Sequence, residues 1–158
     1  MDKYGLTLFF VLCHLFLTDL QVIAGENSSI NVDAKGIALK GYDLVSYYQS
    51  GPKAGRKEYL AKYQGVQYFF ENRENLHRFV AEPEKYIPAY GGWCAWAMLD
   101  GEKVAIDPER FKIIEDRVFL FYDGFWGNTL DKWNKRAETE TDAVLVRKSD
   151  EQWRTLIR

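Results

Sequence analysis

The sequence is poor in the residues that most often build metal sites and disulfides, since its 158 residues include only two cysteines and two histidines. Cys13 and His14 lie in an apolar N-terminal segment, so the rest of the chain holds only Cys94 and His77. A closed zinc site normally takes four Cys or His ligands. The scarcity of these residues excludes such a site. It also means that any Ser-His-Asp arrangement would have to use His77.

Excess basic charge and phosphate-binding loops are lacking as well. The formal net charge is −2, whereas a dedicated nucleic-acid surface needs clustered excess Lys and Arg. Gly91-Gly92 is the one close glycine pair in the central region, and it lacks the flanking pattern of a dinucleotide-binding fingerprint. We therefore expect no nucleic-acid partner and no nucleotide-binding loop.

The single long hydrophobic run lies at the N-terminus. Residues 5–17 are almost wholly apolar, and Val22-Ile23-Ala24 fits a cleavage site before Gly25. A run of about 13 residues is shorter than the ~20 that a helix needs to span a bilayer. The pattern predicts a signal peptide over Met1–Ala24, export to a periplasm or the cell exterior, and no stable membrane span after cleavage. An uncleaved N-terminal anchor is the alternative.

What remains after cleavage fits one compact domain with a single cysteine. Residues 25–36 are polar and without periodicity, which indicates a flexible tether, and residues 37–158 form the domain with a C-terminal helical extension. Aromatic residues make up 16% of the chain, so we expect a core built on large flat side chains. Cys94 is left as a buried thiol, a reactive thiol, a metal ligand or half of an intermolecular bridge.

Local patterns predict a mixture of short strands and helices. Strands are expected over 37–40, 58–63, 66–70, 103–106, 112–114 and 118–122, with Gln64-Gly65 as a hairpin turn. Helices are expected after the capping residues Asp43 and Asn72 and over 143–158. Another is expected after a start signal at Asn128 or Thr129, with its core face formed by Trp126, Leu130, Trp133 and Ala137. No internal repeat is evident. The expected fold class is α+β: a small, mainly antiparallel sheet with flanking short helices.

Several separated motifs together resemble the YHS domain family, and the closest resemblance is to exported single-domain YHS proteins of bacteria. The resemblance covers roughly Ile37 to Trp153. The motifs are Tyr63-Gln64-Gly65, Tyr68-Phe69-Phe70, Phe79, Pro83-Glu84-Lys85-Tyr86, Gly41-Tyr42-Asp43 with Tyr47, the turn from Tyr90 to Ala95, Ile106-Asp107-Pro108, Trp133 and Trp153.

The resemblance implies a fold more firmly than a function. YHS modules accompany heavy-metal ATPases, mercury-resistance proteins and some monooxygenases, and their cysteine-bearing members are thought to bind metals such as copper. This sequence has Gln64 in place of the signature histidine. It has Phe70-Glu71-Asn72 where metal-type members carry a cysteine. Family membership therefore does not transfer a metal site to this chain.

A copper site remains a hypothesis on ligand chemistry. Reduced copper prefers soft thiolate and thioether donors, and Cys94 and Met98 would share a face if that stretch is helical. His77 and Asp107 are the other candidate ligands. The alternative is that Cys94 acts as a small buried hydrophobe, Met98 fills a gap in the core, and His77 lies on the surface.

The leading functional hypothesis is a non-enzymatic binding module with a pocket centred on Cys94, for copper or a small ligand. A structural or interaction domain with Cys94 packed in the core is the alternative, and a thiol-dependent redox enzyme comes third. The sequence leaves the oligomeric state open. The pocket residues would be Tyr42, Asp43, Gly91, Gly92, Trp93 and Trp96.

Overall fold

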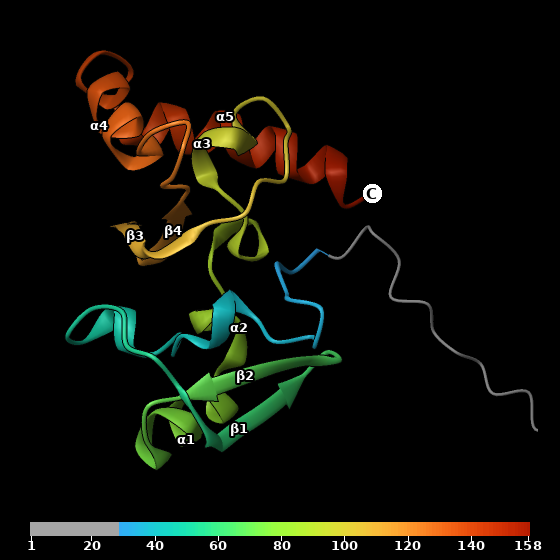
Figure 1. Ribbon diagram of the computed structural model, residues 1–158. Helices are drawn as coiled ribbons and strands as arrows, with labels where there is room; N and C mark the ends of the chain where they lie inside the picture. The colour runs from blue at the N-terminus through green and yellow to red at the C-terminus, as the bar shows by residue number, and fades with distance from the viewer. Residues whose placement is uncertain (1–28) are drawn as a thin grey trace, which may run out of the picture.

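A computed structural model describes residues 29–158 (Figure 1). The predicted signal peptide and residues 25–28 lie outside the described residues. Within them, the fold is a compact α+β arrangement, as the sequence predicts. Its strands form two separate antiparallel hairpins in place of one sheet. Every helix in residues 29–158 is too short or too polar to cross a lipid bilayer.

The first half of the molecule is a hairpin followed by a capped helix. Strand β1 (Arg56–Tyr63) pairs with β2 (Val66–Phe70), and both turn residues, Gln64 and Gly65, have positive φ. Helix α1 (Arg73–Ala81) begins where the Asn72 side chain accepts a hydrogen bond from the Asn75 N–H at 2.9 Å. Pro83 then starts the short helix α2 (Pro83–Tyr86), since proline suits the first helical position.

The second half repeats this order with more helix. The short helix α3 (Ala95–Met98) precedes the hairpin of β3 (Asp107–Ile114) and β4 (Arg117–Phe121). Helix α4 (Thr129–Glu140) follows, and the Asn128 side chain caps its N-terminus. Helix α5 (Asp142–Leu156) closes the chain and packs on α3 and α4. Figure 1 shows the two halves one above the other.

The two hairpins have the same backbone, offset by 51 positions (Arg56 to Asp107, Phe70 to Phe121). Tyr63 pairs with Val66 as Ile114 pairs with Arg117, and both hairpins have a register shift at the same place. The offset also relates the 3-10 turns η1 (Leu39–Gly41) and η3 (Ala89–Gly92). The φ values of residues 39–41 are +49, +53 and +83°, and those of residues 90–92 are +58, +61 and +83°.

This structural repeat is invisible in the sequence, because the counterpart side chains differ in kind. Asp43 and Cys94 hold the same position, and their backbone N–H groups donate to the carbonyls of Lys53 and Val104, at 2.9 and 3.0 Å. The main difference in length follows the hairpins. Asn72 caps α1 two residues after β2 ends, whereas Asn128 caps α4 seven residues after β4 ends.

Strand β4 separates two hydrophobic cores. Val118 and Leu120 face the core of the first half, whereas Phe119 and Phe121 face a second core beneath α4 and α5. All four side chains are fully buried. Successive strand residues point to opposite faces, so a strand covered on both faces is apolar at every position.

Some expected elements differ from the structure. Residues 37–40 form isolated bridges and a 3-10 turn, because Leu39 and Lys40 adopt positive φ. The segment after Asp43 forms only the 3-10 turn η2 (Ser46–Tyr48). Residues 103–106 are not a strand, and β3 begins at Asp107. Trp126 precedes α4 and is 75% exposed, so it is not part of the predicted core face.

Candidate functional site

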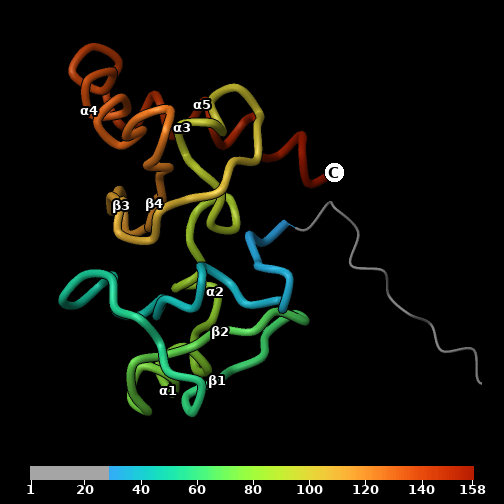
Figure 2. The backbone as a smooth tube through the Cα atoms, in the orientation of Figure 1, coloured from blue at the N-terminus to red at the C-terminus, as the bar shows by residue number. Residues whose placement is uncertain are grey.

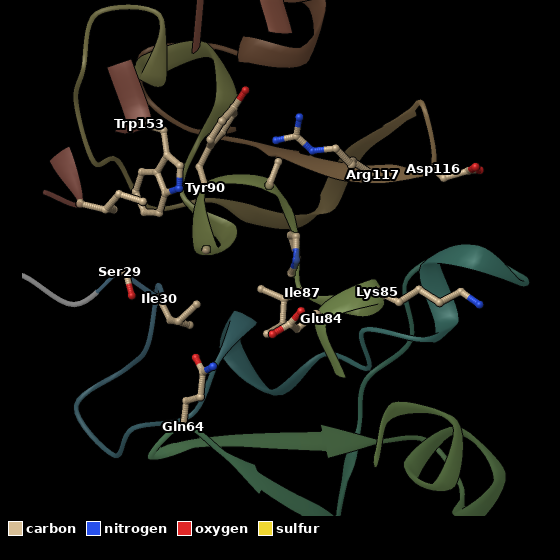
Figure 3. Close-up of a pocket in the computed structure, with 14 residues that line it drawn as sticks. Ser29, Ile30, Gln64, Glu84, Lys85, Ile87, Tyr90, Asp116, Arg117 and Trp153 are labelled. Atoms are coloured by element: carbon tan, nitrogen blue, oxygen red, sulfur yellow. The ribbon is translucent and has the colours of Figure 1, made fainter. Parts of the chain in front are cut away.

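A cleft of about 630 Å³ lies between the two halves. We call it the interhalf cleft. Figure 3 shows its walls coming from distant parts of the chain: the first described residues, the turn of the β1–β2 hairpin, α2, η3, the start of β4 and α5. The lining residues are Ser29, Ile30, Gln64, Glu84, Lys85, Ile87, Pro88, Ala89, Tyr90, Gly91, Asp116, Arg117, Trp153 and Ile157.

The glycine pair brings the N-terminal segment to the cleft. A Cβ on Gly91 would lie 1.8 Å from the carbonyl oxygen of Ser29, so only glycine permits this approach. The N–H of Asn31 donates to the Gly91 carbonyl at 2.8 Å, and its side-chain amide donates to the Gly92 carbonyl at 2.9 Å. Residues 29–36, placed by the sequence in a tether, thus begin against η3 (Figure 2). The pair binds backbone and does not shape a thiol pocket.

Two polar side chains of the cleft are held in place by one carboxylate on α5. Arg117 donates to both oxygens of Asp150, at 3.0 and 2.9 Å, and the Tyr90 hydroxyl donates to the same carboxylate at 3.0 Å. Burial and the charge of Asp150 raise the pKa of Tyr90 above its ordinary value. The hydrogen bond to Asp150 raises the pKa of Arg117 despite burial. Tyr90 therefore stays neutral and Arg117 stays charged across the physiological pH range.

The apolar surface of the cleft comes from aromatic and branched side chains. The Tyr90 and Trp153 rings meet edge to face with centroids 6.1 Å apart, an arrangement that aromatic pairs favour. Ile30 and Ile87 lie opposite them in Figure 3. Arg117 also packs over the Tyr90 ring, with its guanidinium carbon 5.8 Å from the centroid. The cleft thus has a fixed aromatic wall.

Formal charges along the cleft are balanced. Glu84 and Asp116 oppose Lys85 and Arg117. In Figure 3 the side chains of Lys85 and Asp116 point away from the cavity, whereas Glu84 lies beside Ile87. The cleft therefore carries no strong preference for a highly charged ligand of either sign.

Cys94 is a packed thiol and does not line the interhalf cleft. It is 0% exposed, and its sulfur lies 3.5 Å from the Thr129 hydroxyl oxygen. That hydroxyl donates its single proton to the Tyr122 carbonyl at 2.8 Å. The thiol must then be the donor to Thr129, and it is out of reach of solvent.

The predicted copper ligands do not converge. Helix α3 begins after Cys94, and the Met98 side chain packs in the second core while Cys94 packs in the first. His77 is exposed on α1, in the half of the molecule opposite α3 in Figure 1. Asp107 accepts the N–H of Glu109 at 2.9 Å. Within residues 29–158, no group of three or more His, Cys, Asp or Glu residues could hold a metal ion.

Asp43 has a structural task that fully occupies its carboxylate. One oxygen accepts the N–H groups of Val45 and Ser46, at 2.8 and 3.3 Å, as a cap would. The other accepts the Glu71 N–H at 2.9 Å and the Asn75 amide at 2.7 Å. Buried charges need such partners. Asp43 therefore ties together the end of β2, α1 and the turn that precedes η2.

The remaining predicted pocket residues lie apart, except that Trp96 lines a small hollow together with Cys94. The Tyr42 hydroxyl donates a hydrogen bond to Glu109 at 3.3 Å, so it does not join Gly91 and Gly92. The buried indole N–H of Trp93 has no hydrogen-bond partner among the described residues. Trp96 is half-buried beneath the Arg136 guanidinium, whose carbon lies 6.0 Å from the ring centroid. Of the six predicted pocket residues, only Gly91 lines the interhalf cleft.

The sequence did not reveal most of the cleft. Tyr90 and Trp153 belong to motifs of the family resemblance, but nothing in their local sequence unites them with Arg117 or Glu84.

Comparisons with protein-family models, with curated proteins and with solved structures found no match for this chain.

Proposed function

We propose that this chain is an exported, non-enzymatic binding module of the YHS type, with its ligand in the interhalf cleft. The observation that carries the proposal is the cleft itself. Its volume lies within the ~300–1,000 Å³ typical of small-molecule sites. Its aromatic wall is held by the contacts among Tyr90, Arg117 and Asp150, and prior ordering of a site reduces the cost of binding.

The chemistry of the lining favours binding over catalysis. The lining residues include neither cysteine nor histidine, the side chains that most often act as nucleophile or as base near neutral pH. The Tyr90 hydroxyl and the Arg117 guanidinium are already bonded to Asp150. Balanced charge and aromatic walls fit a small molecule with a flat apolar body and low net charge.

The test uses neutral ring compounds as probes. Indole and benzamide are titrated into the isotope-labelled chain, and amide and indole N–H shifts are followed by NMR. We expect saturable shifts at Tyr90, Arg117 and Trp153. Shifts that map elsewhere, or none at all, would contradict the assignment of the ligand site.

A matched pair of isoleucine variants sharpens the test. Ile157 lines the cleft and is 51% exposed, whereas Ile113 lies on β3 outside it and is 40% exposed. Ile157→Ala should weaken probe binding several-fold, because apolar contact is lost. Ile113→Ala should leave binding unchanged. Equal effects of the two substitutions would indicate non-specific binding.

The exported location has a separate test. After expression in a secreting host, N-terminal sequencing of the soluble extracytoplasmic fraction should read from Gly25. Recovery of the intact chain only in the membrane fraction would favour the alternative of an uncleaved anchor.

A further inference from the structure

A second, smaller hollow lies above Cys94, away from the interhalf cleft. Its volume is about 230 Å³, below the range of drug-sized ligands. Cys94 lies under its floor, with no surface accessible to water. We call it the aromatic hollow. Its lining residues are Cys94, Trp96, Ala97, Asp100, Glu102, Val104, Tyr122, Trp126, Thr129 and Lys132.

The aromatic hollow is a place where the second half departs from the first. At the equivalent position of the first half, Ser46 donates to the Asp43 carbonyl at 2.7 Å, and Gln49 donates to Asn75 at 3.1 Å. The counterparts of Ser46 and Gln49, 51 positions later, are Ala97 and Asp100. The hydrogen-bonding side chains of the first half are thus replaced in the second. The floor of the hollow is formed by the Ala97 methyl group and the Cys94 thiol.

The longer connection after β4 supplies one wall. Trp126 belongs to the residues that separate β4 from the cap of α4, a stretch the first half lacks. Its N–H donates to the Tyr122 hydroxyl at 3.4 Å, and its carbonyl accepts from Lys132 at 3.0 Å. These bonds anchor its backbone beside the hollow while 75% of the residue stays exposed. Its ring packs edge to face on that of Phe125, with the ring centroids 4.9 Å apart.

The lining combines three aromatic rings with two carboxylates. Trp96, Tyr122 and Trp126 supply the rings. Asp100 and Glu102 supply the carboxylates, and both residues are exposed. Cations are attracted to aromatic faces, and cages of such rings recognise quaternary ammonium groups. Arg136, which is not part of the hollow, already lies over Trp96.

We propose that the aromatic hollow binds a small organic cation that carries a methylated ammonium group. Two carboxylates against the single positive charge of Lys132 leave an excess negative charge at the site. An anionic ligand would be repelled by that charge. A bare metal ion would meet too few ligands, since these residues form no metal-binding group. A methylated ammonium group is less hydrated than a lysine ammonium and enters an apolar hollow at lower cost.

The experiment titrates choline chloride into the isotope-labelled chain. We expect saturable NMR shifts of the indole N–H groups of Trp96 and Trp126. The neutral compound 3,3-dimethylbutan-1-ol has the shape of choline without its charge, and it should bind at least about tenfold more weakly. Absence of saturable shifts with choline, or equal binding of the neutral compound, would overturn the proposal.

Variants separate the site from its surroundings. Trp126→Leu, and Asp100→Asn combined with Glu102→Gln, should each weaken choline binding by about tenfold. Leu60→Ala is the control, because Leu60 is an exposed apolar residue of β1 and does not line the hollow. All these positions are exposed, so the fold should survive every change. Equal loss of binding in the Leu60 and Trp126 variants would contradict the assignment.

The same methylated ammonium group occurs in free solutes and in lipid headgroups, and sedimentation with vesicles distinguishes them. Retention on phosphatidylcholine vesicles that free choline abolishes would assign the cation to a lipid headgroup. Choline binding without vesicle retention would assign it to a free solute. Both results support the aromatic hollow as a cation site. Retention that choline does not reverse, with no choline shifts, would overturn it.

Discussion

The two halves follow the same backbone path, but they bury different side chains at one equivalent position, Asp43 in the first half and Cys94 in the second. In the first half the carboxylate of Asp43 accepts four hydrogen bonds and ties β2 to α1. In the second half the thiol of Cys94 makes one long contact, to Thr129. The same backbone path can therefore be stabilised by a polar network or by apolar packing. Only the second solution leaves a hollow beside it.

The largest expected effect comes from placing cysteine, the residue of the second half, at position 43 of the first half. Asp43→Cys should lower the free energy of unfolding by at least about 3 kcal/mol, because buried donors lose their acceptor. Asp43→Asn keeps an acceptor oxygen and should cost less. Urea denaturation followed by tryptophan fluorescence measures both. Similar stability of Asp43→Cys and the unmodified chain would mean that the polar network contributes little.

The next prediction concerns the equivalent left-handed turns. Position 40 of the first half carries a lysine side chain, whereas its counterpart Gly91 faces the Ser29 carbonyl. Gly91→Ala should detach the N-terminal segment and cost about 2–3 kcal/mol. Hydrogen exchange at the Asn31 amide should then accelerate.

Gly65→Ala is the control for this substitution, because Gly65 also has positive φ but no atom lies within 4 Å of an added Cβ. It should cost only about 1 kcal/mol, the strain of the backbone conformation. Unchanged protection of Asn31 in Gly91→Ala would show that the segment is held by other contacts.

Cys94 itself should give a smaller effect. Cys94→Ala should lower stability by about 1–2 kcal/mol, since a small cavity replaces the sulfur. The native thiol should react with Ellman's reagent only as fast as the chain opens, because it is fully buried. Rapid labelling under native conditions, or stoichiometric cuprous-ion binding that Cys94→Ser abolishes, would instead favour the copper hypothesis.

The smallest expected effect lies at the junction of α4 and α5, where the helices are longer than those after the first hairpin. Asp142 accepts from the Trp133 indole at 2.7 Å and from Lys112 at 2.8 Å. Burial alone would raise the pKa of Asp142, but these two hydrogen bonds outweigh it and hold the pKa below the ordinary value. A lowered folded-state pKa means that this stabilisation is present above the unfolded pKa of about 4 and is lost as pH falls through the folded value.

Asp142→Asn should therefore cost about 1 kcal/mol at neutral pH. The difference from the unmodified chain should shrink as the pH is lowered below about 4. Thermal unfolding measured across that range checks the sign. A difference that grows toward acid pH would contradict the assigned pKa shift.

Local signals predict the elements that depend on local interactions. The turn at Gln64-Gly65, the capping role of Asn72 and the final helix all follow from neighbouring residues. The left-handed turn at Leu39 and Lys40 does not, because neither residue favours positive φ. The structural repeat escapes notice for a related reason: Ser46 and Ala97 share a backbone position but nothing in their chemistry.

The interhalf cleft depends on tertiary packing, so little of it could be predicted. The glycine pair indicates a close approach, but its partner, Ser29, lies in a segment whose sequence has no pattern. Arg117 looks like a turn residue until α5 brings Asp150 to it. The importance attached to Cys94 came from its rarity. Rarity says nothing of burial, and burial decides what a thiol can do.

Strand β4, covered on both faces, has a consequence for how the molecule unfolds. Each core is completed by side chains of the same five-residue strand, so neither can open without exposing the other. The repeated hairpins are therefore not independent folding units. Heat and denaturant should unfold both halves in one transition. The amide hydrogens of β4 should exchange with solvent only through that global unfolding.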